Sequence, residues 1–252
     1  MKYTVITATY NSEKTLSKTF DSILNQTYNN FEYIVIDGKS NDKTLEIIKS
    51  YEKKFNSTEI KFKWISESDT GIYNAWNKGL KLASGNWISF LGSDDIYLND
   101  AIQSYEALIG SQTKDVDLVY SAVDVVKSNK LIRKINGLWS WNIFKRKMNI
   151  AHVGAFHNKN YFEKYGVFDD GYKIAGDYEL LLRAKQNLKT LKLDKTTALM
   201  AHGGVSNNQI FKVFSETIQA KNKTGELSLL LCYLDFCKAY LIYFAKKILR
   251  YK

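Results

Sequence analysis

Three polar residues, Ser93, Asp94 and Asp95, follow the apolar run Trp87–Leu91 after a single glycine, and such a run is typical of a buried strand. Two adjacent carboxylates repel each other and are costly unless a cation neutralises them. Hard oxygen ligands of this kind favour Mg²⁺ or Mn²⁺ over softer metals. Either aspartate could instead cap the helix that follows, so a divalent-cation site and a helix cap are both open interpretations.

Two other carboxylates stand at the ends of expected elements. Asp37 closes the apolar run Phe31–Asp37, where it could accept a hydrogen bond from a ligand or be capped by backbone groups of the next loop. Asp177 lies at the start of a helix expected over Gly176–Gln186, where an acid usually serves as a cap or as a partner of the helix dipole. Position alone does not separate a structural from a functional role for either residue.

The three histidines do not form a metal site by their spacing. His152 and His157 are five residues apart and would face opposite sides of a strand expected over Ala151–His157. We therefore expect each of them to be a core residue or a polar contact. His202 comes just before two glycines near an expected strand end, and a flexible turn there would let it reach the same edge of the sheet as the carboxylates.

The first part of the chain alternates strands with helices, which implies right-handed crossovers and a mostly parallel sheet. Ligands bind beyond the carboxyl ends of such strands, so the polar segments 7–11, 37–42, 66–71 and 93–95 should converge on one edge. Asn11 or Ser12 is expected to cap the first helix. The expected strands are Tyr3–Thr9, Phe31–Asp37, Ile60–Ser66 and Trp87–Leu91, and further helices are expected over Thr44–Phe55 and Ile72–Leu82.

The second part of the chain is less regular. A domain boundary is plausible only near residues 207–223, which predicts a main domain over 1–206 and a C-terminal helical tail over 207–252. The expected strands are Asp117–Lys127, Leu131–Ile135, Ala151–His157 and Thr190–Ala201, with a helix over Asn158–Tyr165 before the one at Gly176–Gln186.

The composition is that of a globular protein: of 252 residues, 45% are hydrophobic and 25% are charged. We expect no transmembrane segment and, because a strand begins at Tyr3, no signal peptide. The two cysteines, Cys232 and Cys237, form no CxxC pair, which fits a reducing compartment. The chain has no GxGxxG, GxxxxGK[ST] or GxSxG motif, which argues against a dinucleotide dehydrogenase, a P-loop NTPase and an α/β-hydrolase.

The net charge is +10, and residues 221–252 carry seven basic and two acidic residues. A helix over Leu227–Arg250 would be apolar on most of its circumference, with tyrosines and lysines that suit a membrane interface. Packing on the protein's own domain or on a second copy explains the pattern equally well, so a membrane surface and a homo-oligomer both stay open. Nucleic acid is not expected as a partner, because the basic residues stand among aliphatic ones rather than beside arginines and stacking aromatics.

Ten short motifs occur in order within residues 2–206 and together resemble family 2 glycosyltransferases of the A-type nucleotide-sugar fold. Each motif alone is weak, whereas the ordered series is specific. The motifs are Thr7–Asn11, Val35–Thr44, Ser66–Tyr73, Asn77–Gly79, Ala83–Gly85, Phe90–Asp95, His152–Phe156, Gly166–Asp169, Gly176–Arg183 and Gly203–Ser206.

The resemblance implies an α/β fold with a Rossmann-like, mostly parallel central sheet flanked by helices and a C-terminal helical extension. Residues 1–100 would form a nucleotide-sugar half and residues 101–206 an acceptor half. The implied activity is inverting transfer of a sugar from a nucleotide-diphosphate donor, with uridine diphosphate expected, to a glycan or lipid-linked acceptor of cell-surface polysaccharide synthesis. The implied location is the cytoplasm, with peripheral contact to the inner face of the cell membrane as an option.

The same resemblance assigns roles to individual residues. It places Asp95 on a Mn²⁺ or Mg²⁺ ion and Asp177 at the position of the catalytic base, and we add His202 as a candidate second metal ligand. A base is needed because a sugar hydroxyl must lose its proton as it attacks the anomeric carbon, and a cation stabilises the departing diphosphate. The implied donor contacts are Thr7, Thr9, Tyr10, Asp37, Asp69, Asn77 and Asp94.

Three positions depart from the pattern of that family. Gly176 stands where an acid usually precedes the base, Trp76 stands where many members carry arginine, and Gly92 stands where another acid often begins the metal motif. A catalytically inactive module that binds a nucleotide or a glycan is therefore the alternative function.

Overall fold

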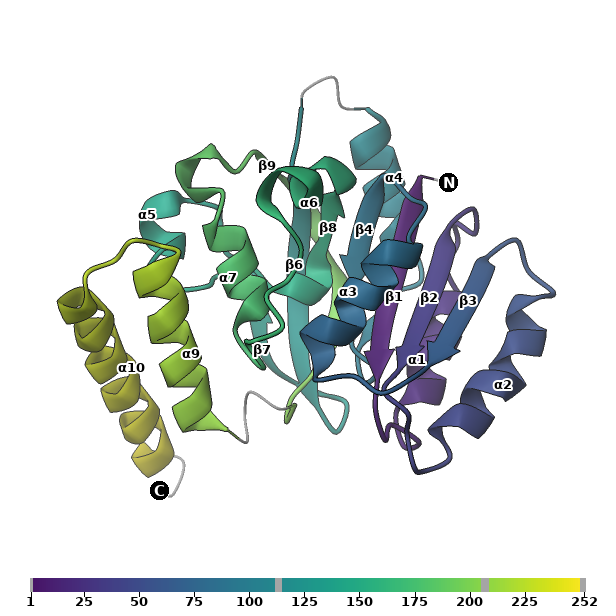
Figure 1. Cartoon of the computed structure of the whole chain (residues 1–252), viewed down its shortest axis with the longest axis horizontal. Coiled ribbons are helices and arrows are strands. Elements are labelled where there is room, and N and C mark those ends of the chain that lie inside the picture. The colour runs from purple at the N-terminus through teal and green to yellow at the C-terminus, as the bar shows by residue number, and fades with distance from the viewer. Residues whose placement is uncertain (1, 112–114, 205–208, 250–252) are drawn as a thin grey trace.

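The computed structural model describes residues 2–111, 115–204 and 209–249, and its centre is one nine-stranded sheet (Figure 1). The strand order is β3-β2-β1-β4-β8-β6-β9-β5, with β7 paired to β6. The strands are β1 (Tyr3–Thr9), β2 (Glu32–Asp37), β3 (Lys61–Ser66), β4 (Trp87–Phe90), β5 (Ile96–Tyr97), β6 (Leu118–Lys127), β7 (Lys130–Ile135), β8 (Ala155–Asn158) and β9 (Thr190–Ala201). The helices are α1 (Leu16–Leu24), α2 (Thr44–Phe55), α3 (Ile72–Leu82), α4 (Ala101–Gly110), α5 (Trp141–Phe144), α6 (Lys159–Tyr165), α7 (Gly176–Leu182), α9 (Ile210–Lys223) and α10 (Leu229–Leu249), with 3₁₀ helices η1 (His152–Gly154) and η2 (Lys185–Asn187).

The strands of the first half are parallel, as predicted. β1 pairs with β2 and β4, and β2 pairs with β3. Thr9 stands opposite Asp37, and Asp37 stands opposite Ser66, so three strands end at the same level. The predicted strands and helices of this half agree with the structure to within one residue at each end. The exception is the cap of α1, which begins after Thr15 without a side-chain cap from Asn11 or Ser12.

The strands of the second half are mostly antiparallel, so the parallel pairing predicted from the alternation of strands and helices belongs to the first half, and the predicted α/β fold with flanking helices is confirmed. β8 is antiparallel to both β4 and β6, and β5 is antiparallel to β9. β6 and β7 form a hairpin whose turn residues, Ser128 and Asn129, have φ of 48° and 62°, a conformation that suits a tight hairpin. Among the described strands of this half, β6 and β9 are the one pair that is parallel.

Two predicted elements of this half have different bounds. The strand expected over Ala151–His157 begins only at Ala155, because His152–Gly154 form η1. The helix expected to reach Gln186 ends at Leu182.

Helices cover both faces of the sheet and bury two hydrophobic clusters (Figure 1). On one face, α1, α2 and α4 contribute Phe20, Phe55 and Tyr105 to the first cluster. On the other face, α3, α6 and α7 contribute side chains such as Trp76 and Leu180 to the second cluster. Burial of these large apolar side chains holds the helices against the sheet, and it fixes the ends of α3 and α7 relative to the strand ends.

The C-terminal helices continue from this second face. α9 lies beside α7, and α10 lies beside α9 (Figure 1). Asp235 of α10 forms ion pairs with Lys221 of α9 and with Arg146, so one side of α10 is bound to its own chain. The predicted boundary at 206 falls on residues 205–208, which lie outside the described part, as do residues 250–252 of the predicted tail. Among the described residues, no helix combines the length and the apolar character needed to cross a bilayer.

Candidate active site

Hydrogen bonds between loops join the ends of β1, β2 and β4 into one site. The amide of Asn11, after β1, donates to Ser40 Oγ, after β2, at 2.8 Å. Ser12 Oγ, also after β1, lies 2.9 Å from Ser93 Oγ, after β4. The polar segments that follow these strands therefore converge as predicted.

Tyr10, Gly38 and Asp69 meet at this edge of the sheet. A Cβ on Gly38 would lie 2.5 Å from Asp69 Oδ2 and 3.4 Å from Tyr10 Cδ2, so a larger residue at position 38 would displace the Asp69 carboxylate. Asp69 Oδ1 accepts a hydrogen bond from the amide of Gly71, and the Tyr10 ring is 58% exposed. The exposed ring of Tyr10 can stack on a nucleotide base, and the carboxylate of Asp69 can accept a hydrogen bond from the base or from a ribose. The geometry therefore suits donor binding by these two residues.

Asp37 is fully buried and holds its own loop. Its carboxylate accepts hydrogen bonds from the amide and hydroxyl of Ser40 and from Ser66 Oγ at the end of β3. Asp37 therefore has the structural role of a loop carboxylate that is held by neighbouring groups. Its contact with the donor stays a prediction. Opposite it, Thr9 Oγ1 is buried and has no hydrogen-bond partner within the described part of the chain, and a bound donor could satisfy this hydroxyl.

Two predicted donor contacts, Thr7 and Asn77, form hydrogen bonds within the protein. Thr7 is fully buried, and its hydroxyl accepts a hydrogen bond from Tyr33 at 3.0 Å inside the core. Asn77 lies on α3, where its amide group both donates to and accepts from the backbone of Phe168. Packing within the protein thus engages the polar atoms of both side chains, and their contact with the donor stays a prediction.

Asp94 and Asp95 do not cap a helix, so that interpretation is excluded: α4 begins at Ala101 and its N-cap is Asp100. Asp94 is exposed at the edge of the sheet, whereas Asp95 is buried and its Oδ1 accepts a hydrogen bond from the amide of Ala201 at 2.9 Å. Burial, together with the neighbouring charge of Asp94, raises the pKa of Asp95 to about 7. Desolvation also raises the pKa of Asp94, so a nearby cation would stabilise the ionised pair.

The space between the two carboxylates exists because residue 92 is glycine. A Cβ on Gly92 would lie 2.7 Å from Asp95 Oδ2 and 3.1 Å from Asp94 Oδ1. Two carboxylate oxygens that face one open space fit a hard divalent cation. Among the described residues, however, no three His, Cys, Asp or Glu side chains are grouped as a metal site. His202 follows Ala201, the residue that bonds to Asp95, so its backbone lies beside the pair while its ligation of a metal stays a prediction.

Asp177 is partly buried at the second residue of α7. Its Oδ1 accepts hydrogen bonds from the amide of Tyr178 at 2.8 Å and from the hydroxyl of Tyr73 at 3.2 Å. Burial raises the pKa of Asp177 to about 6, although these two hydrogen bonds favour the ionised form. A carboxylate with this pKa is ionised near neutral pH and still basic enough to take a proton from a hydroxyl group.

Tyr73 and Lys173 are residues of the site that the sequence did not single out. Tyr73 reaches Asp177 from α3, and Lys173 Nζ donates to the carbonyl oxygen of Thr70 at 2.8 Å. Together they join the loop after β3 to the loop before α7. Tyr73 is the last residue of the motif Ser66–Tyr73, and its place in that motif was the one indication of a role in the sequence. Nothing in the sequence indicates that Lys173 contacts Thr70.

Two departures from the family pattern have a packing explanation. A Cβ on Gly176 would lie 2.7 Å from the ring of Tyr73, so that ring occupies the space an acidic side chain would need. Trp76 is 7% exposed and packs against Tyr73, Phe90 and Phe168. Residue 76 is therefore a core residue in this structure.

His152 and His157 do not face opposite sides of a strand. Their Nε2 atoms lie 3.0 Å apart, because His152 belongs to η1 while His157 belongs to β8. Both rings are buried against Phe90, which confirms that they are core residues in polar contact. Burial lowers the pKa of both, that of His152 to about 3.

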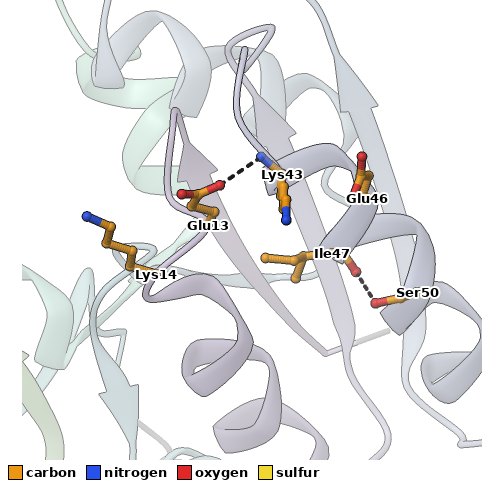
Figure 2. A pocket seen from close by; sticks show the side chains of 6 residues that line it. All are labelled: Glu13, Lys14, Lys43, Glu46, Ile47 and Ser50. Carbon is orange, nitrogen blue, oxygen red and sulfur yellow. Dashed lines mark hydrogen bonds between the residues drawn. The ribbon is translucent and has the colours of Figure 1, made fainter.

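A charged hollow lies between the start of α1 and α2, beside the site (Figure 2). In it, Glu13 accepts a hydrogen bond from the amide of Lys43 at 3.1 Å. The hollow contains none of the predicted site residues and lies next to the loops after β1 and β2. It is lined by Glu13, Lys14, Lys43, Glu46, Ile47 and Ser50.

Known proteins are similar to this chain in sequence or in fold. A "PGL/p-HBAD biosynthesis glycosyltransferase" of Mycobacterium bovis is 30% identical over 88% of this chain and 86% of its own. The Escherichia coli "UDP-Glc:alpha-D-GlcNAc-diphosphoundecaprenol beta-1,3-glucosyltransferase WfgD" is 30% identical over 52% of this chain and 49% of its own. The crystal structure of S. aureus TarS 1-349 in complex with UDP-GlcNAc matches the fold with a TM-score of 0.68 over 92% of this chain and 69% of its own, at 20% identity.

The sequence model of the family described as "Glycosyl transferase family 2" matches residues 4–168. That range includes the converging loops after β1 to β4 and the Asp94–Asp95 pair. Together with the M. bovis relative, which is similar along almost the whole chain, it confirms the resemblance carried by the ordered motifs. The chain belongs to glycosyl transferase family 2.

Proposed function

We propose that this glycosyltransferase moves a sugar, with inversion at the anomeric carbon, from a uridine-diphosphate donor to a lipid-linked saccharide. The observation that carries the proposal is the arrangement of Asp177 relative to the donor loops: Tyr73 and Lys173 tie the loop before α7 to the loop after β3. An acceptor hydroxyl bound beside Asp177 would give its proton to the carboxylate as it attacks the sugar. The printed name of the E. coli relative supports both the uridine donor and the lipid-linked acceptor.

The carboxylates of Asp94 and Asp95 would hold a Mn²⁺ or Mg²⁺ ion, with His202 as a further candidate ligand. When bound, such an ion stabilises negative charge on the departing diphosphate. Tyr10 and Asp69 would bind the base and ribose, and Thr9 would donate its unpaired hydroxyl to the donor. Thr9 ends β1, and Tyr10, Asp69, Asp94 and Asp95 lie on loops that follow strands of the parallel half of the sheet, whereas His202 follows β9.

The test is a thermal-shift screen of nucleoside diphosphates and UDP-sugars, with and without Mn²⁺, on the wild type and on Asp95→Ala. A ligand present at 100 times its Kd stabilises a protein by about 2.7 kcal/mol, so binding should give a clear shift. We expect one nucleotide to stabilise the wild type in a metal-dependent way and not to stabilise Asp95→Ala. Asp194→Ala, which removes an exposed carboxylate of β9 outside the site, is the matched control and should respond like the wild type.

The screen, followed by an assay of UDP release, distinguishes the alternative function. No shift with any nucleotide would contradict the donor site itself. Metal-dependent binding without slow release of UDP from the bound UDP-sugar would indicate an inactive binding module rather than a transferase.

We further propose that α10 lies on a membrane surface, where a lipid-linked acceptor would be met. Several apolar side chains of α10 are exposed, among them Leu230 at 71% and Leu241 at 69%, beside the exposed Lys238. Sedimentation with phosphatidylglycerol vesicles should carry the wild type and fail to carry Leu230→Ser/Leu241→Ser. Leu138→Ser, at a site 67% exposed elsewhere, is the control. A concentration-dependent dimer without vesicle binding would identify a second copy as the partner instead.

A further inference from the structure

A buried acid outside the family motifs holds the loop that carries the predicted base. Glu216 lies on α9, is 8% exposed, and points at the loop just before α7. Its carboxylate accepts hydrogen bonds from three consecutive amides, those of Lys173 (3.1 Å to each oxygen), Ile174 (2.8 Å) and Ala175 (3.0 Å). Successive amides that converge in this way form an anion-binding concavity, and here the anion is a side chain of the protein itself.

The loop held by Glu216 contacts the groups that surround Asp177. Tyr73 Oη lies 2.7 Å from the carbonyl oxygen of Ile174 and 3.2 Å from Asp177 Oδ1. The single hydroxyl proton of Tyr73 is therefore shared between the loop and the carboxylate. The position of Ile174 decides how much of that hydrogen bond Asp177 receives.

Lys173, in the same loop, connects it to the donor side of the site. Its amide binds Glu216 while its ammonium group donates to the carbonyl oxygens of Thr70 and Asp170. Asp69, a predicted donor contact, immediately precedes Thr70. A displacement of residues 173–175 would therefore alter both Asp177 and the loop after β3.

We propose that Glu216 is a positioning residue for Asp177: by binding the amides of residues 173–175 it fixes the start of α7, and with it the distance from Asp177 to Tyr73. The proposal rests on the proposed role of Asp177 as the base. It also assigns α9, which follows the end of the family match at residue 168, to the catalytic apparatus. Charge-assisted hydrogen bonds to backbone amides are strong enough to impose such an arrangement, and a displacement of about 1 Å can cost up to about 100-fold in rate.

The test replaces Glu216 by glutamine, which keeps the size of the side chain but turns an NH₂ group toward amides that are themselves donors. Glu226→Gln is the matched control, because Glu226 is 70% exposed and pairs only with Lys185 among the described residues. The measurements are the rate of UDP release from UDP-glucose and UDP-N-acetylglucosamine, the Kd for UDP, and hydrogen exchange of residues 172–178. We expect kcat of Glu216→Gln to fall about 10- to 100-fold, with the Kd for UDP and KM within twofold of the control and faster exchange in that segment.

A readout that needs no turnover is the titration of the Asp177 carboxyl carbon by NMR, assigned by comparison with Asp177→Asn. Besides burial, which raises the pKa of Asp177, the hydrogen bond from Tyr73 lowers it and the charge of Glu216 raises it. Glu216→Gln changes these last two contributions, so this titration should differ from that of Glu226→Gln. If Glu216→Gln matches Glu226→Gln in both titration and hydrogen exchange, the positioning role is refuted. An equal loss of UDP affinity and of kcat would also refute it, because a general structural role would then suffice.

Two further variants separate the possible failures. Glu216→Asp keeps the charge on a shorter side chain, so it tests the reach of the carboxylate if Glu216→Gln does not fold, and it should give a smaller fall in kcat at an unchanged melting temperature. Asp177→Asn tests the proposed function. If Asp177→Asn abolishes UDP release while Glu216→Gln behaves like the control, only the positioning role fails. If Asp177→Asn releases UDP at the wild-type rate, the assignment of Asp177 as the base fails.

Discussion

The hydroxyl of Tyr73 lies 3.2 Å from Oδ1 of Asp177, although the two residues are 104 positions apart in the chain. Tyr73 stands in the first turn of α3, which follows a donor loop, and Asp177 stands in the first turn of α7. This contact joins the parallel half of the sheet to the irregular half at the point where we place the chemistry.

Asp177→Asn should abolish sugar transfer and leave donor binding intact. Asparagine keeps the shape of the side chain but cannot accept the proton of an attacking hydroxyl. The checks are the rate of transfer or of UDP release, and the Kd for UDP by calorimetry. If donor affinity fell as much as the rate, Asp177 would be a binding residue and not a base.

The wild-type kcat should fall as the pH decreases through about 6. Burial raises the pKa of Asp177 to about 6, and a base is active only when ionised, so the active fraction decreases below that pH. In Tyr73→Phe the acid limb should move to higher pH, because the hydrogen bond from Tyr73 favours the ionised form. The measurement is kcat from pH 5 to pH 8 in both proteins. An unchanged acid limb in Tyr73→Phe would mean that the contact has no influence on the base.

Gly92→Ala should weaken the metal dependence of nucleotide binding. The added Cβ would lie 2.7 Å from Asp95 Oδ2, so it would displace the carboxylate or fill the space between Asp94 and Asp95. We expect the Mn²⁺ concentration for half-maximal stabilisation by UDP to rise at least about tenfold, which corresponds to about 1.4 kcal/mol. Gly204→Ala is the control, because a Cβ there would meet no atom within 4 Å among the described residues. Equal metal dependence in Gly92→Ala and the control would contradict a cation between the two carboxylates.

Gly176→Ala should destabilise the protein and slow the reaction together. Its Cβ would lie 2.7 Å from the ring of Tyr73, and overpacking of this kind typically costs about 1–3 kcal/mol. Urea unfolding measures the stability, and UDP release measures the rate. A variant as stable and as active as the wild type would show that the ring of Tyr73 can move away without effect on Asp177.

Buried His157 should make the free energy of unfolding depend on pH, and His157→Phe should remove that contribution. Because burial lowers the pKa of His157 well below its usual value, the unfolded chain binds a proton near pH 6.5 that the folded protein does not. This histidine therefore contributes stability that is present above pH 6.5 and is lost as the pH falls. The raised pKa values of Asp95 and Asp177 act in the opposite direction, so the useful quantity is the difference between wild type and His157→Phe.

We expect the unfolding free energy of the wild type minus that of His157→Phe to rise with pH between 4.5 and 6.5, by at most about 1.4 kcal/mol per pH unit. His202→Gln is the control, because His202 is only partly buried. A difference that does not change with pH would mean that His157 is protonated equally in the folded and unfolded states.

The sequence by itself determined the parallel half of the fold. Helices α2 and α3 were predicted with their observed bounds, and strands β1 to β4 to within one residue at each end. The reason is that buried parallel strands are nearly continuous apolar runs, whereas apolar residues recur every three to four positions in an amphipathic helix. The rule that ligands bind beyond the carboxyl ends of strands then placed Tyr10, Asp69 and Asp95 at one edge. The ordered motifs identified the family from the same residues.

Only the tertiary structure decided how individual polar groups are used. Thr7 and Asn77 match donor positions in sequence, yet Tyr33 and Phe168 engage their polar atoms. The reason is that a motif records residue types and spacing, whereas a hydrogen bond depends on which distant groups the packing of helices brings within about 3 Å.

The same limit applies to α9 and to the histidines. Glu216 lies in a segment predicted as a separate tail, and its role depends on the contact of α9 with the loop before α7. His152 and His157 meet because three residues form a 3₁₀ turn instead of extending the strand. Side-chain periodicity in sequence predicts the faces of regular elements, but such irregular turns and long-range contacts are settled by packing across the whole domain.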